Sequence, residues 1–101
     1  MKYYAVVRVT MTDDSWVEAY LPAVTALVHK HGGEYLARTT NMERVEGNAD
    51  LPNVFVVIAW PSREAAESFY DDPEYQPYLQ SRLAGADNDF VLVAGEDIAN
   101  G

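Results

Sequence analysis

Residues 53–60, Asn-Val-Phe-Val-Val-Ile-Ala-Trp, are the stretch that decides the fold of this chain. β-Branched and aromatic side chains favour an extended strand, in which successive side chains point to opposite faces. One face of this strand carries Val54, Val56, Ile58 and Trp60, and the other carries Phe55, Val57 and Ala59. Because both faces are apolar, the pattern predicts a strand in the centre of a sheet that is covered on both sides.

The residues before this strand predict a strand, a helix and further extended segments. Residues 3–11 are β-branched and aromatic, which favours a strand. Apolar side chains then recur at three- and four-residue steps over residues 16–31, as in an amphipathic helix. Residues 34–39 and about 42–46 predict two short strands or one kinked strand.

The residues after it predict a helical pair and a last strand. Ser62 is a typical N-cap for one helix, and Asp72-Pro73 ends that helix and opens a second helical segment. Residues 90–95 predict the last strand. The resulting βαββαβ order is that of a ferredoxin-like α+β sandwich, an antiparallel sheet whose right-handed crossovers place the helices on one face.

This fold leaves one face of the sheet without helices. An open face exposed to water normally carries polar side chains, but the strands at 53–60 and 90–95 are apolar on both faces. A large exposed apolar patch marks an interaction surface. We therefore expect a homodimer in which two sheets pack face to face and form a dimeric α/β barrel.

The composition limits the classes of protein that remain. The chain has 101 residues, so we expect one domain over residues 1–96 and a tail over 97–101. Seven Lys and Arg against sixteen Asp and Glu give a net charge of −9, which argues against a nucleic-acid partner. No apolar run reaches the roughly 18 residues of a membrane span, and Arg8 interrupts the N-terminal apolar stretch. We therefore expect an acidic cytoplasmic protein with no membrane partner.

Several motifs follow one another in the order of a known family. They are His-Gly-Gly-Glu-Tyr-Leu-Ala-Arg at 31–38, Val-Glu-Gly at 45–47, the run at 56–66, Phe-Tyr-Asp-Asp-Pro-Glu-Tyr at 69–75, and Asp-Phe-Val-Leu-Val-Ala-Gly at 89–95. On these motifs the chain resembles domain-of-unknown-function family 1330 of the dimeric α/β-barrel superfamily. The resemblance implies a ferredoxin-like fold and a dimer rather than an activity. This chain departs from the family at Thr39-Thr40, where the family usually has two glycines.

The resemblance also selects candidate site residues. Five of them match polar and aromatic motif positions of the family: Arg38, Glu46, Tyr70, Tyr75 and Arg82. Arg82 shares the apolar side of its predicted helix with Tyr75, so we expect its guanidinium to be partly buried and to pair with Glu46. Two arginines that converge beside two tyrosines suit a small carboxylate or an enolate. The alternative is a structural ion-pair network of Arg38, Glu46 and Arg82.

The two histidines complete the set of candidates. His31 lies on the apolar side of the first predicted helix, in its last turn, where it serves either as a proton shuttle or as a cation at the helix C-terminus. His29 points away from that side. Without cysteine, and with the two histidines on opposite sides, the sequence predicts no metal site and no cofactor.

Three functions remain open at this point. The first is a protein that binds a small carboxylate or enolate-like molecule in a cavity between sheet and helices. The second is a cofactor-independent monooxygenase or isomerase, in which Arg38, Arg82 and a tyrosine hold an enolate and His31 or Glu46 is the base. The third is a structural dimer without a ligand. The sequence does not decide whether the protein is an enzyme.

Overall fold

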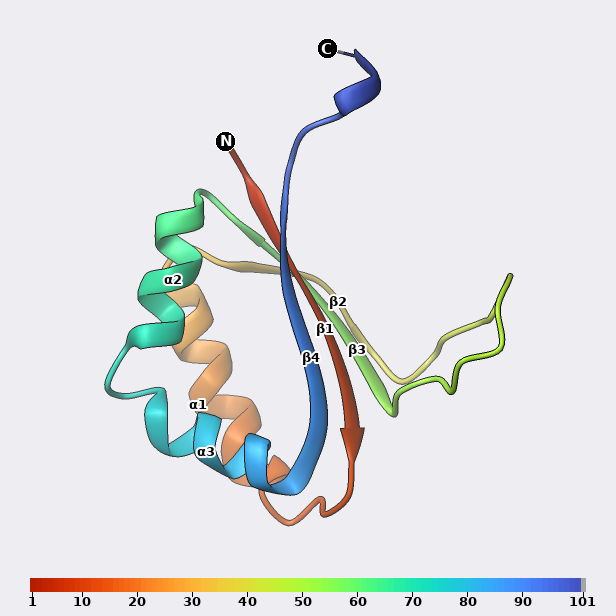
Figure 1. Cartoon of the computed structure of the whole chain (residues 1–101). Coiled ribbons are helices and arrows are strands. Elements are labelled where there is room, and N and C mark those ends of the chain that lie inside the picture. Colours follow the sequence, from red (N-terminus) through yellow and green to blue (C-terminus); the bar gives the residue numbers. More distant parts are fainter. Residues whose placement is uncertain (101) are drawn as a thin grey trace.

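The strand at residues 54–60 lies inside a four-stranded antiparallel sheet, as predicted. The computed structural model describes residues 1–100 (Figure 1). Its elements are β1 (Tyr3–Met11), α1 (Val17–Lys30), β2 (Glu34–Thr39), β3 (Val54–Trp60), α2 (Arg63–Asp71), α3 (Gln76–Gly85), β4 (Ala86–Ala94) and a 3₁₀ turn, η1 (Ile98–Asn100). The strand order is β2-β3-β1-β4, and all three helices cover the same face (Figure 1). The ferredoxin-like α+β fold is thereby confirmed.

The core lies between this sheet face and the helices. β1 pairs with both β3 and β4, so that Ala5 lies opposite Ile58 on one side and Leu92 on the other. The strands bury Ala5, Val7, Val9, Ile58, Trp60 and Ala86, and the helices bury Val24, Leu27, Val28, Ala66, Phe69 and Leu79. Burial of each Val, Leu, Ile or Phe side chain among them stabilises the fold by about 1.5–3 kcal/mol.

Local signals set the ends of two helices. Gly32 follows α1 with a φ of +83°, a left-handed conformation that favours glycine. The next residue, Gly33, packs so tightly that a Cβ there would lie 2.7 Å from Val28 and 2.8 Å from Trp60. At the start of α2, the Ser62 hydroxyl oxygen accepts a hydrogen bond of 3.1 Å from the backbone N–H of Ala65. The predicted N-cap at Ser62 is confirmed.

Three predicted boundaries are wrong. Residues 42–46 form no strand, because no neighbouring strand lies beside them to accept their backbone hydrogen bonds. α3 begins at Gln76 instead of Pro73, since Asp72 caps a separate turn through the backbone N–H of Glu74 at 2.9 Å. β4 begins at Ala86, four residues before the predicted start. The tail predicted over 97–101 contains η1, and Gly101 lies outside the described residues.

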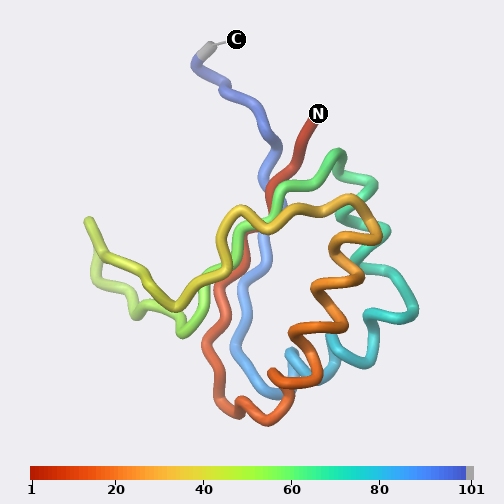
Figure 2. Tube along the Cα trace, turned by 180° about the vertical axis from the view of Figure 1, so that it is seen from behind, coloured from red at the N-terminus to blue at the C-terminus, as the bar shows by residue number. Residues whose placement is uncertain are grey.

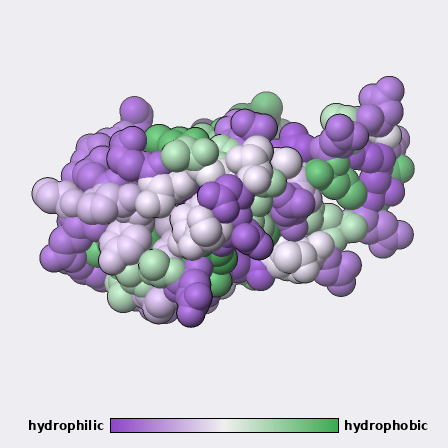
Figure 3. Space-filling view, turned by 90° about the horizontal axis from the view of Figure 1, so that it is seen from below, coloured by the Kyte–Doolittle hydropathy of each residue, from purple (hydrophilic) through white to green (hydrophobic). Residues whose placement is uncertain are grey.

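The irregular connection over residues 40–53 projects away from the helices. Figures 1 and 2 show it on the side of the sheet opposite to α1, α2 and α3. Val45 and Leu51 of this connection are 91% and 47% exposed. Figure 3 shows the molecule from below; its surface there is mainly hydrophilic with separate hydrophobic patches, including one on the projecting connection. At its base, the Arg8 guanidinium donates to the carbonyl oxygen of Asp50 at 3.0 Å.

The open face of the sheet carries apolar side chains, as the alternation of residues predicted, together with the charged side chains of Arg8, Asp87 and Asp89. Three of its large apolar side chains are well exposed: Leu36 (53%), Val91 (47%) and Val93 (45%). Within residues 1–100, every helix is too short or too polar to cross a bilayer.

Candidate ligand-binding cavity

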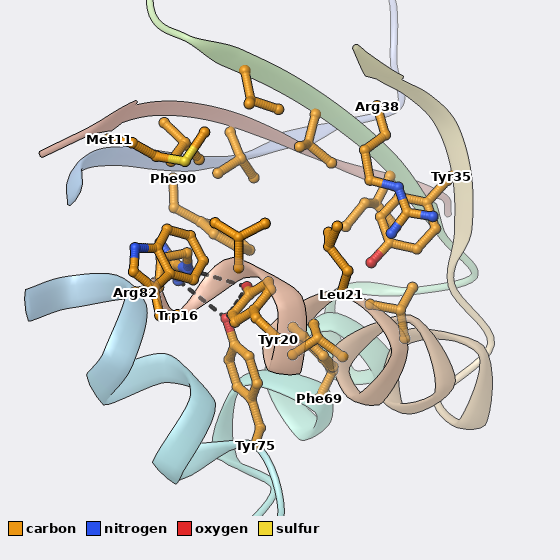
Figure 4. Close-up of a pocket in the computed structure, with 18 residues that line it drawn as sticks. Met11, Trp16, Tyr20, Leu21, Tyr35, Arg38, Phe69, Tyr75, Arg82 and Phe90 are labelled. Carbon is orange, nitrogen blue, oxygen red and sulfur yellow. Dashed lines mark hydrogen bonds between the residues drawn. The ribbon is translucent and has the colours of Figure 1, made fainter. Parts of the chain in front are cut away.

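A cavity of about 100 Å³ lies between α1 and the covered face of the sheet (Figure 4). Its walls are mainly apolar side chains of β1, β3 and α1, such as Val7, Val56 and Val24. The strand residues face inward because side chains alternate between the two faces of a sheet, and the helix residues face inward because they recur on one side of α1. An apolar cavity of about 150 Å³ takes up a benzene-sized molecule; this space has about two thirds of that volume, which suits a small acid without a ring.

Three polar side chains meet at the inner end of the cavity. Arg82 comes from α3, Tyr75 from the residue before α3, and Tyr20 from α1. Arg82 Nε donates to the Tyr20 hydroxyl at 3.1 Å, and Arg82 Nη2 donates to the Tyr75 hydroxyl at 3.0 Å. The two hydroxyl oxygens are 3.3 Å apart and share a hydrogen bond. We call Arg82, Tyr20 and Tyr75 the inner cluster; Figure 4 shows its hydrogen bonds as dashed lines.

The inner cluster holds a buried positive charge without a negative partner. Arg82 is 3% exposed, and its Nη1 has no hydrogen-bond partner among the described residues. The ion pairs of residues 1–100 involve only Lys30, His31 and Arg63 as cations. Burial raises the pKa of Tyr20, so its hydroxyl stays neutral and supplies no negative charge to Arg82. A guanidinium cannot lose its proton, and burying an unpaired charge is costly.

A second arginine lies at the other end of the cavity. Arg38 extends from β2, and its Nη1 donates to the Thr25 hydroxyl of α1 at 2.7 Å. Its guanidinium carbon lies 3.9 Å from the centre of the Tyr35 ring, a cation–π contact. Burial raises the pKa of Tyr35, so this phenol too remains neutral. Figure 4 shows Arg38 and Tyr35 on one side of the cavity and the inner cluster on the other.

The structure places three of the six predicted site residues on this cavity: Arg38, Tyr75 and Arg82. The two arginines do not converge, because β2 and β4 are the opposite edges of the sheet and α3 leads into β4. The predicted pair of Arg82 and Glu46 is absent from residues 1–100. Glu46 belongs to the connection over residues 40–53, and Figure 1 shows that this connection projects away from the helices. The predicted ion-pair network of these three residues is therefore absent as well.

Tyr70 and His31 lie outside the cavity. Tyr70 is 37% exposed, and its ring stands edge-on to those of Tyr75 and Phe90, at 6.0 and 5.6 Å between centres. His31 Nε2 lies 2.8 Å from a carboxylate oxygen of Asp72, between the end of α1 and the end of α2.

Asp72 is the centre of a polar cluster at the ends of α1 and α2. Lys30 also donates to its carboxylate, at 3.1 Å, and the Asp72 side chain is 7% exposed. The hydrogen bonds from His31, from the backbone of Glu74 and from Lys30 lower the pKa of Asp72 to about 2. The cluster ties α1 to the α2–α3 turn and thereby positions Tyr75. No group of three or more His, Cys, Asp or Glu in residues 1–100 could hold a metal ion.

Tyr20 is the site residue that the sequence analysis missed as a candidate. Its position on the apolar side of α1 predicts a core residue, and its ring packs edge-on against that of Trp16, with 5.0 Å between the ring centres. A signal was present: a phenol on a buried stripe needs a hydrogen-bond partner, and Arg82 was predicted on a buried stripe of its own.

The fold and this cavity define a class: ferredoxin-like α+β proteins with an apolar cavity between sheet and helices. The chain belongs to the family described as "Domain of unknown function (DUF1330)", whose model matches residues 2–96. The resemblance seen in the sequence motifs is thereby confirmed. No curated protein sequence is similar enough to this chain to count as a match.

Solved structures with the same fold have low sequence identity to this chain. A protein of unknown function from Rhodopseudomonas palustris is similar with a TM-score of 0.81 and 14% identity, over 95% of this chain and 83% of that one. A dimeric ferredoxin-like protein of unknown function from Jannaschia sp. gives 0.72 and 12%, over 93% and 99%. SnoaB, a cofactor-independent oxygenase from Streptomyces nogalater, gives 0.65 and 19%, over 99% and 98%.

Proposed function

We propose that the protein binds a small organic anion, a carboxylate or an enolate, in the cavity beside the inner cluster. The observation that carries this proposal is the buried guanidinium of Arg82, which lines the cavity and has no carboxylate partner among the described residues. Hydrogen bonds from a guanidinium to an anionic oxygen are among the strongest in proteins. An anion that enters this cavity would neutralise the charge that the fold leaves unpaired.

This arrangement suits a ligand site better than a scaffold. A structural arginine normally gains its stabilising effect from a carboxylate or from several carbonyl oxygens. Arg82 instead donates to two neutral phenols, which are weaker acceptors, and keeps Nη1 free. The chain contains sixteen acidic residues, yet none of them lines the cavity.

A cofactor-independent oxygenase is a second candidate, favoured by the similarity in fold to SnoaB. Such an enzyme needs a group that removes a proton from its substrate. The two bases expected from the sequence, His31 and Glu46, do not line the cavity, whose titratable side chains are all Tyr or Arg. Binding is therefore the function that the cavity supports better.

The proposal is tested by isothermal titration calorimetry with propanoate and with propanamide, a neutral molecule of the same shape. We expect propanoate to bind and propanamide to bind at least tenfold more weakly, because one hydrogen bond to a charged group contributes about 1.5–3 kcal/mol. Arg82→Met should abolish the preference for propanoate. Arg63→Met, which removes an exposed arginine paired only with Glu67, should preserve it. Equal affinities of the two molecules for the unmodified protein would contradict the proposal.

We further propose that two copies pair through the open face of the sheet. Its exposed valines and Leu36 support this pairing, as does the projecting connection, which lies on the same side and would extend along a partner. The similar protein from Jannaschia sp. is described as dimeric. A dimer would cover apolar area that one subunit leaves in water.

A further inference from the structure

We propose that the ligand is a short saturated monocarboxylate such as propanoate, with its carboxylate at the inner cluster and no other polar group. This inference rests on the proposed function and names the chemical class of its ligand. Two observations carry it. The cavity has a volume of only about 100 Å³, and apolar side chains form the walls between the inner cluster and solvent (Figure 4).

The exposed end of the cavity fixes the direction in which the ligand lies. Among the residues that line the cavity, Leu21 of α1 is 44% exposed and Arg38 of β2 is exposed too, whereas the others are half-buried or buried. Figure 4 shows Leu21 and Arg38 on one side and Arg82 on the other. A ligand whose carboxylate contacts the inner cluster therefore directs its tail toward Leu21.

The walls along this path offer no partner to a polar tail. They are formed by side chains such as Val9, Val24 and Val56. Trp16 also lines the cavity, but its indole N–H already donates to the carbonyl oxygen of Gly85 at 3.4 Å. A hydroxyl or a second carboxylate on the tail would lose its hydration there without gaining a hydrogen bond, which is unfavourable. The walls therefore select a tail of carbon and hydrogen alone.

The volume of the cavity limits the length of that tail. A cavity of about 150 Å³ holds the six carbons of benzene, so by proportion about 100 Å³ holds roughly four non-hydrogen atoms. Propanoate, with five, fills this space once its carboxylate oxygens contact the inner cluster. Each methylene group that leaves water tightens binding by about fourfold. Carbons beyond the limit extend past Leu21 into solvent and add no affinity.

The test compares small acids by calorimetry at neutral pH and one salt concentration. Propanoate and glycolate form a matched pair, because glycolate has a hydroxyl where propanoate has its methyl group. We expect propanoate to bind about tenfold more tightly, since glycolate would bury an unpaired hydroxyl. Acetate, butanoate and hexanoate measure the length limit. Affinity should rise about fourfold from acetate to propanoate, and hexanoate should bind no more tightly than butanoate.

Two neighbouring valines of β3 provide a variant and its control. Val56 is half-buried and lines the cavity, whereas Val57 pairs with Val6 on the opposite face of the sheet and does not line it. Val56→Ala deletes two methyl groups from the wall and leaves space for a longer tail. It should raise the affinity of hexanoate relative to propanoate by roughly fivefold or more, and Val57→Ala should leave this ratio unchanged.

The outcomes separate this inference from the proposed function. Equal affinities for propanoate and glycolate would overturn the inference, while binding of a small anion would still stand. A steady rise in affinity from acetate through hexanoate would overturn it too, as would an unchanged ratio in Val56→Ala. If none of these acids binds, the proposed function fails as well. Because the ligand series uses the unmodified protein, it decides the question even if Val56→Ala does not fold.

Discussion

Replacing Arg82 by Met should remove ligand binding without destabilising the ligand-free protein. The substitution deletes two hydrogen bonds from a charged donor, at 3.1 and 3.0 Å, which would cost about 3–6 kcal/mol together if each contributes about 1.5–3 kcal/mol. It also removes a charge that is 3% exposed and has no carboxylate partner among the described residues, and the penalty for burying such an ion is several kcal/mol. The two phenols retain their bond to each other at 3.3 Å.

These two effects are of similar size, so the free energy of unfolding of Arg82→Met should lie within about 1 kcal/mol of the unmodified protein or above it. For a domain of this length, about 1 kcal/mol corresponds to a change of roughly 4–8 °C in the melting temperature. The assay is urea denaturation without ligand, at one protein concentration because the stability of the proposed dimer would depend on concentration. A loss of more than about 3 kcal/mol would mean that Arg82 stabilises the fold, and would refute the reasoning.

Three further predictions address the rest of the molecule. The pKa of Asp72 is lowered to about 2, so the contribution of its carboxylate to stability is complete above its ordinary pKa near 4 and is lost as the pH falls toward 2. In a plot of melting temperature against pH, Asp72→Asn should flatten this acidic part, whereas Asp71→Asn should leave it steep. Gly33→Ala should lower the free energy of unfolding by about 1–3 kcal/mol in urea denaturation, because the new methyl group would lie less than 3 Å from the core side chains of Val28 and Trp60. An unchanged midpoint would contradict the packing described above. Val91→Asp on the open face should convert a dimer to an 11.3 kDa monomer in sedimentation velocity, whereas Leu83→Asp, equally exposed on α3, should not.

The sequence predicted the central elements of the fold well, because their signals are local. The apolar alternation at residues 53–60 and the helical period at 16–31 each describe an element that buries one complete face. It failed where pairing decides the structure. The predicted last strand began at residue 90, yet residues 87–89, Asp-Asn-Asp, extend β4 because Val9 and its neighbours in β1 pair with them. Residues 42–46 read as a strand, yet no strand lies beside them to pair with.

The site was predicted in part for a related reason. The burial of Arg82 and Tyr75 followed from their shared helical side, and both line the cavity. The expected partner of Arg82 was wrong, because the direction of the connection that carries Glu46 depends on tertiary structure and leaves no trace in local sequence. Tyr20 was missed because a core tyrosine and a site tyrosine have the same helical spacing.

The most direct test of the anion site is the NMR resonance of the Arg82 Nε–H group, assigned by its loss in Arg82→Met. Because this group is buried and hydrogen-bonded to the Tyr20 hydroxyl, its resonance should be protected from exchange with water. Titration with propanoate should shift this resonance progressively and to saturation, while the resonance of the exposed Arg63 stays in place. An Arg82 resonance that does not move at saturating propanoate would contradict the account.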